Sequence, residues 1–383
     1  MSVIQLLRDN PTTVDKTIDL TIERLSSTGD TYRDGAPDPA LNMYFPLTSY
    51  QSTLLALRKF KNFAPTIASV VEEDQDIPIR RGRISLTQEN IDNIKVATKY
   101  LVTEKDLKLL FELENSLLRN DQQTAQAIKD EFCGIPATLE ASCTFTGMML
   151  SLKLATTGKC TYTDAESKAK VQLSYLDSIP SGHIASTKTG TSKWSNLTNA
   201  TGIQDIVDHL KVVYRTLRRY PNAIVMNLTE ADNLRNQNST KEMIAREKGI
   251  ITDGQTVDAS ALANIIPPTL EEISMLISRL LLDSAGMSGN ARIEIKVSDS
   301  IYYLSEANND YSEHTYVPEG YYFFAWNNYI ERAILPCAGN EFAGGIAINY
   351  DTQNAPRREW IAAECNMLPL CADPRKIAGR KVE

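Results

Sequence analysis

The first sixty residues show no sustained repeat of apolar positions. Prolines and glycines, which break regular structure, interrupt the short apolar runs at Pro11, Gly29, Gly35, Pro37, Pro39 and Pro46. This pattern predicts an N-terminal arm over residues 1–60, extended and with short helical pieces. Because so little apolar surface is available for the arm to bury on its own, we expect neighbouring copies of the chain to order it.

The pattern of residues 67–102 is typical of two long strands that extend away from the body of the protein and return. We therefore place an extended loop, a β-hairpin, over residues 61–102. The apolar run IASVV leads in, a polar stretch follows, and the alternating segment KVATKYLV returns. An isolated hairpin is only marginally stable in water, so this one should rest on another surface. Its charges form two blocks of opposite sign and are the candidate inter-subunit contacts: Glu72, Glu73, Asp74 and Asp76, then Arg80, Arg81 and Arg83. The alternative is a solvated loop whose charges only keep it soluble.

A strong helical pattern begins at Thr103, where T-E-K-D supplies an N-cap and an acid three residues later. Apolar residues then recur on related helix faces: Leu107, Leu110, Phe111, Leu117, Leu118, Ala125 and Ile128. Gly134 and Pro136 are predicted to end this helix, and a second helix is predicted from beyond Pro136 to near Gly158. Two consecutive helices would form a rigid spine.

The segments CTYTD and KVQLSYL have the pattern of strands, and the turn-rich stretch after them is predicted to be a loop anchored by Trp194. A helix over residues 206–217, a buried strand AIVMNL and a helix capped by Thr229 are predicted next. Residues 236–268 are polar and rich in Gly and Pro, which predicts a loop with one helix near Met243.

In the last third of the chain, apolar and polar residues alternate less regularly, but one helix and four strands can still be predicted. Thr269 and Glu272 form a capping box ahead of a helix that Gly286 is expected to close. Four strands follow: RIEIKV, YYFFAW, GGIAINY and REWIAAECNML. Long helices combined with mainly antiparallel strand pairing place the chain in the α+β class.

The length and the charge narrow the possible functions. With 383 residues the chain exceeds the roughly 250–300 residues that one core usually serves, so two lobes are expected. The formal net charge of −8 argues against free nucleic-acid binding, because phosphate neutralisation needs clustered Lys and Arg. The cysteines lack a C-x-x-C pair and are expected to be buried thiols of a reducing cytoplasm: Cys133, Cys143, Cys160, Cys337, Cys365 and Cys371. We expect neither a signal peptide nor a membrane span.

The sequence predicts no catalytic, cofactor-binding or metal-binding site. The three histidines, His183, His209 and His314, have no metal-ligand spacing, and neither a nucleophile elbow nor a phosphate-binding glycine loop is present. The aromatic pair Tyr321–Tyr322 lacks the interleaved Lys or Arg of a nucleic-acid platform, so strand packing is expected. The basic residues near the C-terminus are expected to be solvated: Arg375, Lys376, Arg380 and Lys381.

The order of these segments is similar to that of one protein family. Five short motifs between residues 95 and 383 carry the similarity: LATTGKCTYT, TGTSKWS with Asp205–Ile206 following eleven residues after Trp194, PNAIVMNL, VPEGYYFFAWNN and NMLPLCADPRKI. The ordered set resembles the lambda-like major capsid (head) proteins of tailed phages, which have the Hong Kong ninety-seven-like fold. The resemblance implies a peripheral domain with a spine helix over residues 103–190, a mixed axial domain over 191–330, and residues 331–383 that return to the peripheral domain and end in a C-terminal tail.

The same resemblance implies a function as a structural protein of the virion. The chain would form hexamers and pentamers in an icosahedral shell, first as a procapsid with a scaffolding protein and a portal protein, in the host cytoplasm. The shell would enclose DNA without reading its sequence, and whether a decoration protein binds outside stays open. One alternative is an encapsulin-like compartment with the same fold. A remote alternative is a two-lobed small-molecule-binding protein or enzyme.

Overall fold

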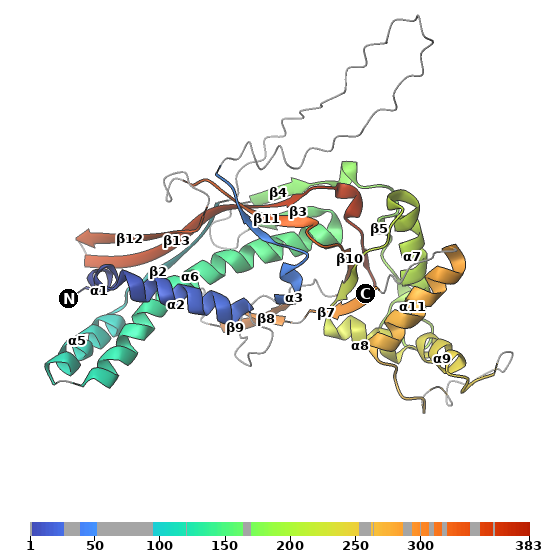
Figure 1. Ribbon diagram of the computed structural model, residues 1–383, viewed down its shortest axis with the longest axis horizontal. Helices are drawn as coiled ribbons and strands as arrows, with labels where there is room; N and C mark the ends of the chain where they lie inside the picture. Colours follow the sequence, from blue (N-terminus) through green and yellow to red (C-terminus); the bar gives the residue numbers. More distant parts are fainter. Residues whose placement is uncertain are drawn as a thin grey trace, which may run out of the picture.

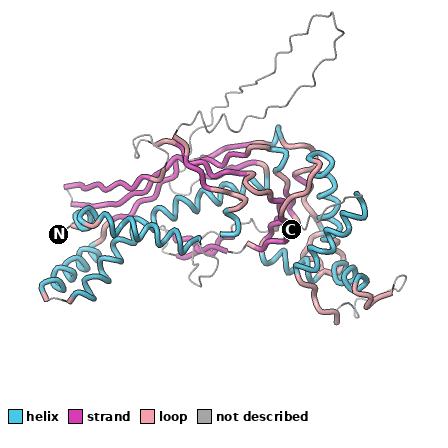
Figure 2. Tube along the Cα trace, in the orientation of Figure 1, coloured by secondary structure: helices cyan, strands magenta, loops and turns pink. Residues whose placement is uncertain are grey.

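A computed structural model gives the fold of the chain (Figures 1 and 2). It describes all residues except 1, 27–38, 52–94, 120, 164–169, 253–261, 263, 286–292, 299, 306–309, 316–319, 338–344 and 355–356. The molecule is elongated, with the N-terminal helices and one sheet at one end and a second sheet surrounded by helices at the other. A single long helix, α6 (Gln122–Thr157), runs along the first sheet toward the second (Figure 1).

The described N-terminal residues contain helices, as predicted for the short helical pieces of the arm, but these helices are longer and better packed than expected. The helices are α1 (Val3–Asp9), α2 (Pro11–Ser26) and the short α3 (Pro39–Asn42). The buried apolar side chains of α1 and α2 belong to the core that α6 forms with the first sheet: Val3, Leu6, Leu7 and Val14. The expectation of a segment without its own packing surface is therefore wrong for residues 3–18, because apolar residues at helical spacing give it a face that the same chain covers.

The first spine helix begins where the sequence predicts. In α5 (Glu104–Leu118), the Thr103 hydroxyl accepts from the backbone N–H of Asp106, and the Asp106 carboxylate accepts from the backbone N–H of Thr103. This reciprocal capping box satisfies two N–H groups that a helix start otherwise leaves without partners. The helix ends earlier than expected, at a turn that leads directly into Asp121, the N-cap of α6.

The predicted helix stop at Gly134 and Pro136 is wrong. α6 continues through both residues and ends at Gly158, as expected, with a left-handed φ of 71°. Proline removes one helical hydrogen bond, but Pro136 lies buried in the face that packs against the first sheet. Burial of the apolar residues along this face offsets the lost bond, which the local pattern around Pro136 does not reveal.

Five strands form the first sheet, in the order β1–β11–β13–β12, with β2 also paired to β13. They are β1 (Leu47–Ser49), β2 (Lys95–Leu101), β11 (Ile330–Leu335), β12 (Ala347–Asn354) and β13 (Arg357–Cys371). All pairs are antiparallel except β1 with β11. Alternate residues of β13 are buried in the core shared with α6: Ile361, Ala363, Cys365 and Met367. The residues between them are only half-buried, so one face of the sheet is covered and the other is partly open.

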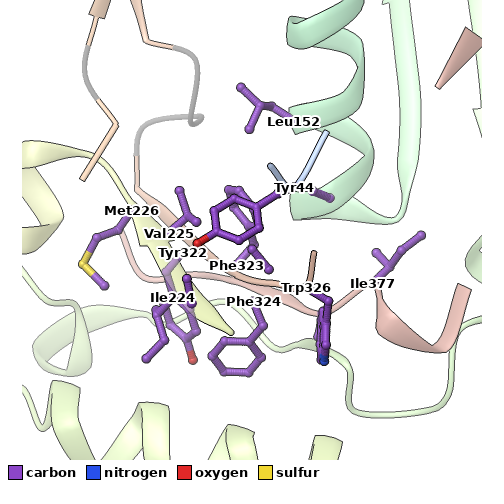
Figure 3. Close-up of a cluster of buried hydrophobic side chains, with 14 of the residues drawn as sticks. Tyr44, Leu152, Ile224, Val225, Met226, Tyr322, Phe323, Phe324, Trp326 and Ile377 are labelled. Atoms are coloured by element: carbon purple, nitrogen blue, oxygen red, sulfur yellow. The ribbon is translucent and has the colours of Figure 1, made fainter. Parts of the chain in front are cut away.

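The second sheet has the order β5–β14–β10–β6–β7. Its strands are β5 (Ile184–Ala185), β6 (Ala223–Met226), β7 (Glu294–Val297), β10 (Tyr321–Ala325) and β14 (Gly379–Lys381). The helices at this end of the molecule are α7 (Gly202–Leu217), α8 (Leu228–Asn236), α9 (Asn238–Glu247) and α11 (Leu270–Ala285). Figure 3 shows side chains of α6, β6 and β10 meeting in one core, among them Leu152, Val225 and Phe323.

The basic C-terminal segment is not a solvated tail. β14 pairs with β10 on one side and with β5 on the other. Ile377, Ala378 and Val382 are fully buried in the same core as β10. The expectation of solvated basic residues holds for Arg375, which is exposed, whereas Lys376, Arg380 and Lys381 are half-buried, because the apolar residues between them determine where the segment packs.

Short elements connect these layers. Two hairpins are β3 (Lys159–Thr163) with β4 (Lys170–Ser174) and β8 (Ser300–Ser305) with β9 (Asp310–Thr315). Three 3₁₀ turns are η1 (Leu176–Ser178), η2 (Gly190–Ser192) and η4 (Pro374–Lys376).

The α+β class predicted from the sequence is confirmed, as are the strands predicted at β3, β4, β6, β7, β10, β12 and β13. The Thr269 and Glu272 capping box is present at the start of α11, with both backbone N–H groups bonded. The helix near Met243 is α9, but α8 also extends to Asn236, so less of residues 236–268 is loop than expected. The N-cap of α8 is Asn227 instead of Thr229. The bounds of the five predicted segments stay predictions.

Candidate functional site

The residues predicted to contact other subunits lie outside the described part of the chain. Glu72, Glu73, Asp74, Asp76, Arg80, Arg81 and Arg83 all fall within residues 52–94. The structure does describe the strands on both sides of this segment. β1 precedes it and β2 follows it, and both belong to the first sheet. The segment therefore leaves one sheet and returns to the same sheet.

The helix α5 exposes an apolar face that the sequence pattern assigned to the interior. Leu107 is 45% exposed, Phe111 66% and Leu118 84%. The face that packs inward carries Asp106, Leu110, Leu113 and Ser116. Apolar residues cover more of the circumference of α5 than one packed face needs, and this excess was the available signal for a second surface.

The outer face of the first sheet carries polar and aromatic side chains. The Lys99 ammonium lies 3.7 Å from the centre of the Trp360 ring, and Lys95 Nζ lies 2.5 Å from a carboxylate oxygen of Glu364. Both pairs join β2 to β13. Within the described residues, β2 and β12 pair with β13 alone, so each has one edge without a strand partner there. The first sheet thus offers an open face and open edges.

The end of the molecule that holds the first sheet is here called the first lobe, and the end that holds the second sheet is called the second lobe. A nearly buried charge cluster lies in the second lobe, around Asp205 on α7. Lys188 Nζ lies 2.6 Å from Asp205 Oδ1, and the Trp194 indole N–H donates to Asp205 Oδ2 at 3.3 Å. Arg380 of β14 lies 3.9 Å from the same carboxylate and donates to the Ser186 carbonyl. One carboxylate therefore connects the loop before α7, the helix itself and the C-terminal strand. The sequence had indicated Trp194 as a buried anchor and noted Asp205 eleven residues later, and the structure brings the two together.

A histidine beside this cluster is held neutral. His209 Nε2 donates to the His183 carbonyl at 2.8 Å, which leaves Nδ1 to accept from the Tyr322 hydroxyl at 3.0 Å. Burial lowers the pKa of His209 to about 4, and burial also lowers the pKa of His183. A neutral, fully bonded imidazole inside the core does not serve as a proton carrier for an external substrate. It fixes α7 against β10 and the loop that contains His183.

The cysteines are buried free thiols in the structure, as expected. Cys143 and burial together raise the pKa of Cys365, and burial raises the pKa of Cys160 to about 11. Such thiols stay protonated and unreactive at neutral pH. Among the described residues, no group of three or more His, Cys, Asp or Glu side chains is placed to hold a metal ion. No helix in the described ranges combines the length and the apolar character needed to cross a membrane.

Comparison with known proteins gives structural similarities only. No protein-family model matches the chain, and no curated protein matches it. A proposed capsid protein of an E. coli CFT073 prophage is 14% identical, with a TM-score of 0.45 over 76% of this chain and 77% of that one. A phage-related protein of Bordetella bronchiseptica RB50 is 9% identical, with a TM-score of 0.41 over 76% and 75%. A satellite phage P4 procapsid, solved with its size determination protein, gives 8% identity and a TM-score of 0.36 over 83% and 80%.

Proposed function

We propose that this chain is a shell subunit, of which many copies close into an icosahedral container. The observation that carries the proposal is where the unsatisfied surfaces lie. The first lobe presents an open sheet face, the apolar face of α5 and the two anchored ends of residues 52–94. The polar groups clustered around Asp205 and His209 in the second lobe, in contrast, form hydrogen bonds with one another inside the subunit. Such a body is suited to bind further copies of itself, not a small substrate.

In its specific form, the proposal is a major capsid protein of the lambda-like family with the Hong Kong ninety-seven-like fold. The ordered motifs of the sequence support it, and several of them lie at structurally central places. The segment PNAIVMNL contains β6, and YYFFA is β10, the two most buried strands of the second sheet. Residues 103–190 and about 331–372 would form the peripheral domain and residues 191–330 the axial domain.

The container would hold double-stranded DNA without binding it tightly. The formal net charge of −8 makes the chain a poor neutraliser of phosphate, as a wall facing packaged DNA should be. Hexamers and pentamers of the chain would assemble in the host cytoplasm, with a scaffolding protein and a portal protein as partners, and the finished shell would be part of the virion. No catalytic step is part of this function.

The contact residues we assign are the two charge blocks within residues 52–94. The acidic block, Glu72, Glu73, Asp74 and Asp76, and the basic block, Arg80, Arg81 and Arg83, would each meet charge of opposite sign on a neighbouring subunit. The anchoring of both ends of the segment in the first sheet supports this assignment, because it gives the segment a fixed origin.

Particle formation is the direct test. The full chain is produced alone and together with the genes that neighbour its own, and the products are separated by sedimentation and viewed by electron microscopy. Closed shells are expected. Soluble monomers under every condition, including co-expression with a scaffolding protein, would contradict the proposal. Adjacent portal and large-terminase genes would indicate a phage head, whereas particles filled with a cargo protein would indicate the encapsulin-like alternative.

A charge reversal tests the assigned contacts. The triple change Arg80→Glu, Arg81→Glu and Arg83→Glu should prevent shell assembly while leaving the circular dichroism spectrum of the monomer unchanged, because like charges across an interface cost several kcal/mol. The matched control replaces the same three residues by Lys, which keeps the charge and should keep assembly. Normal shells from the Glu variant would show that the segment is only solvated.

A further inference from the structure

Three of the four exposed apolar residues of α5 form one strip along the helix, and the fourth, Leu117, lies on another side of it. Successive residues of a helix are about 100° apart, so Leu107, Phe111 and Leu118 lie within about 40° of one another around the axis. All three are between 45% and 84% exposed, and α5 lies at the end of the molecule farthest from the second lobe (Figure 1). No other described element of the chain covers this strip.

A row of alternating charges runs directly beside the strip. Glu104, Lys108, Glu112 and Arg119 follow one another along the helix at steps of four to seven residues, and all are exposed. They occupy the next sector of about 80° on the same side of the strip. Among the described residues, this row forms one weak pair, between Lys108 and Glu104 at 3.2 Å, and its side chains are 76% and 84% exposed.

We infer that the α5 strip binds the α5 strip of a second copy of the chain, with the two helices antiparallel around a two-fold axis near Phe111. With a rise of about 1.5 Å per residue, this pairing places Phe111 against Phe111 of the second copy. It also places Leu107 within about 3–5 Å along the axis of the level of Leu118 of the second copy, and the reverse. Every exposed apolar residue of the strip then has an apolar neighbour.

The charge row supplies the reason for choosing a second copy as the partner. This two-fold axis is perpendicular to both helices. The charge rows of the two copies therefore lie on the same side of the contact and run in opposite directions. Glu104 then lies level with Arg119 of the second copy, and Lys108 lies close to the level of Glu112 of the second copy. The symmetry doubles each pair, so four oppositely charged pairs border the apolar strip.

The parallel arrangement does not fit the same residues. In a parallel pair, a two-fold axis along the helices would place the charge rows of the two copies on opposite sides of the contact. The oppositely charged residues of the two rows would then not meet, and the pairs that the antiparallel arrangement forms would be lost. The sequence of charges along α5 therefore selects the antiparallel pair.

This contact deepens the proposed function, since an isologous contact at one end of the subunit would join neighbouring groups of subunits in a shell. The pairing itself depends only on α5, however, and would exist in a dimer that forms no shell. The two claims can therefore fail separately.

Disulfide trapping tests the geometry. Full-length chains carrying Phe111→Cys should form a disulfide-linked dimer under mild oxidation, whereas Lys105→Cys, on another side of α5, should form at least 10-fold less. Leu107→Cys chains mixed with Leu118→Cys chains should crosslink, and Leu107→Cys alone should not. Wild-type protein gives the background of the native thiols. Equal crosslinking of Leu107→Cys alone and in the mixture would overturn the antiparallel arrangement.

A charge exchange tests the pairing without cysteines. Glu104→Arg should weaken self-association at least 10-fold in sedimentation equilibrium, and the double variant Glu104→Arg with Arg119→Glu should restore it. Circular dichroism checks that each variant is folded. A double variant no better than the single one would overturn the inference. Shells without α5 crosslinks would refute the pairing and leave the shell function standing, and α5 dimers without shells would do the reverse.

Discussion

The two lobes of this protein use their sheets in opposite ways. In the second lobe, β6 is buried along its whole length and β10 nearly so, and the sheet packs between α7 on one side and residues near β1 and α6 on the other. In the first lobe, α6 and the N-terminal helices cover one face only, and the other face and the strip on α5 remain exposed. The second lobe covers both faces of its sheet, although single apolar side chains such as Ile266 stay exposed, whereas the first lobe leaves one sheet face and the strip on α5 open.

This difference indicates where function resides. A protein that acted on a small molecule would be expected to place converging polar groups in an accessible cavity. Here the polar cluster around Asp205 is enclosed by the residues it connects. Exposed apolar side chains gather on one outer helix, α5, whereas those of the second lobe, such as Ile250 and Ile266, are scattered over separate segments. This contrast supports the proposal that the open first lobe is the surface for other subunits.

The contrast between the two lobes is tested most strongly by replacing one tryptophan in each lobe with alanine. Trp194 is fully buried, stacks on Tyr322 with ring centres 5.4 Å apart and donates to Asp205. Trp194→Ala should lower the free energy of unfolding by about 3–5 kcal/mol. Trp360, half-buried beneath Lys99 on the open sheet face, should cost only about 1–2 kcal/mol when changed to Ala.

Urea unfolding of the two variants measures both effects. Equal losses would mean that the outer face of the first sheet is packed as tightly as the core of the second lobe. The contrast between the lobes would then be wrong.

Acid should destabilise the second lobe through His209. Its pKa falls from an ordinary value of 6.5 to about 4 because burial disfavours the charged imidazole. The unfolded chain therefore binds a proton that the folded chain does not, so this contribution to stability is constant above pH 6.5 and is lost as the pH falls toward 4. The loss approaches about 3 kcal/mol.

The control for this effect is His209→Gln, which removes the titration. The midpoint of urea unfolding is measured for wild type and for this variant at pH 7.5 and at pH 4.5. The difference between the two proteins should change with pH, because the effect of the carboxyl groups that both proteins have is the same in each and cancels. A difference that stays constant over this range would show that His209 is already protonated in the folded protein.

Two glycines of α6 give the smallest and most local comparison. A Cβ at Gly147 would overlap the sulfur of Met367, which is fully buried on β13, so Gly147→Ala should cost about 1–2 kcal/mol. A Cβ at Gly134 meets no atom within 4 Å, so Gly134→Ala should gain about 0.5–1 kcal/mol from helix propensity. Thermal unfolding should shift in opposite directions, and a loss in both would mean that α6 is packed along its whole length.

Several elements follow from local sequence because their signals are local. The capping boxes at Thr103 and Thr269 need only residues three apart, and both are formed. The stop at Gly158 needs only a residue that accepts a positive φ. The strands YYFFA and AIVM were evident because both faces of each are apolar, and each is buried in the core of the second lobe.

The predictions from the sequence were wrong where residues far apart in the chain determine the local structure. Pro136 remains in a helix because it is buried and its neighbours in α6 share a core with β13, more than two hundred positions later. The basic C-terminal segment becomes a strand because β5 and β10 flank it. Residues 3–18 are helical and packed because α6 provides their surface. In each case the local composition was polar or broken, and burial against another element outweighed it.

The sequence by itself determined the α+β class, the helix starts at Thr103 and Thr269, the core strands and the absence of any local motif for catalysis, because each of these depends on residue types within a few positions. Only the tertiary structure decided which face of α5 is buried, where the C-terminal strand lies and that Asp205 joins three segments. These depend on which surfaces meet. Burial free energy is a property of pairs of surfaces, and one of the surfaces left over, on α5, fits a second copy of the same chain.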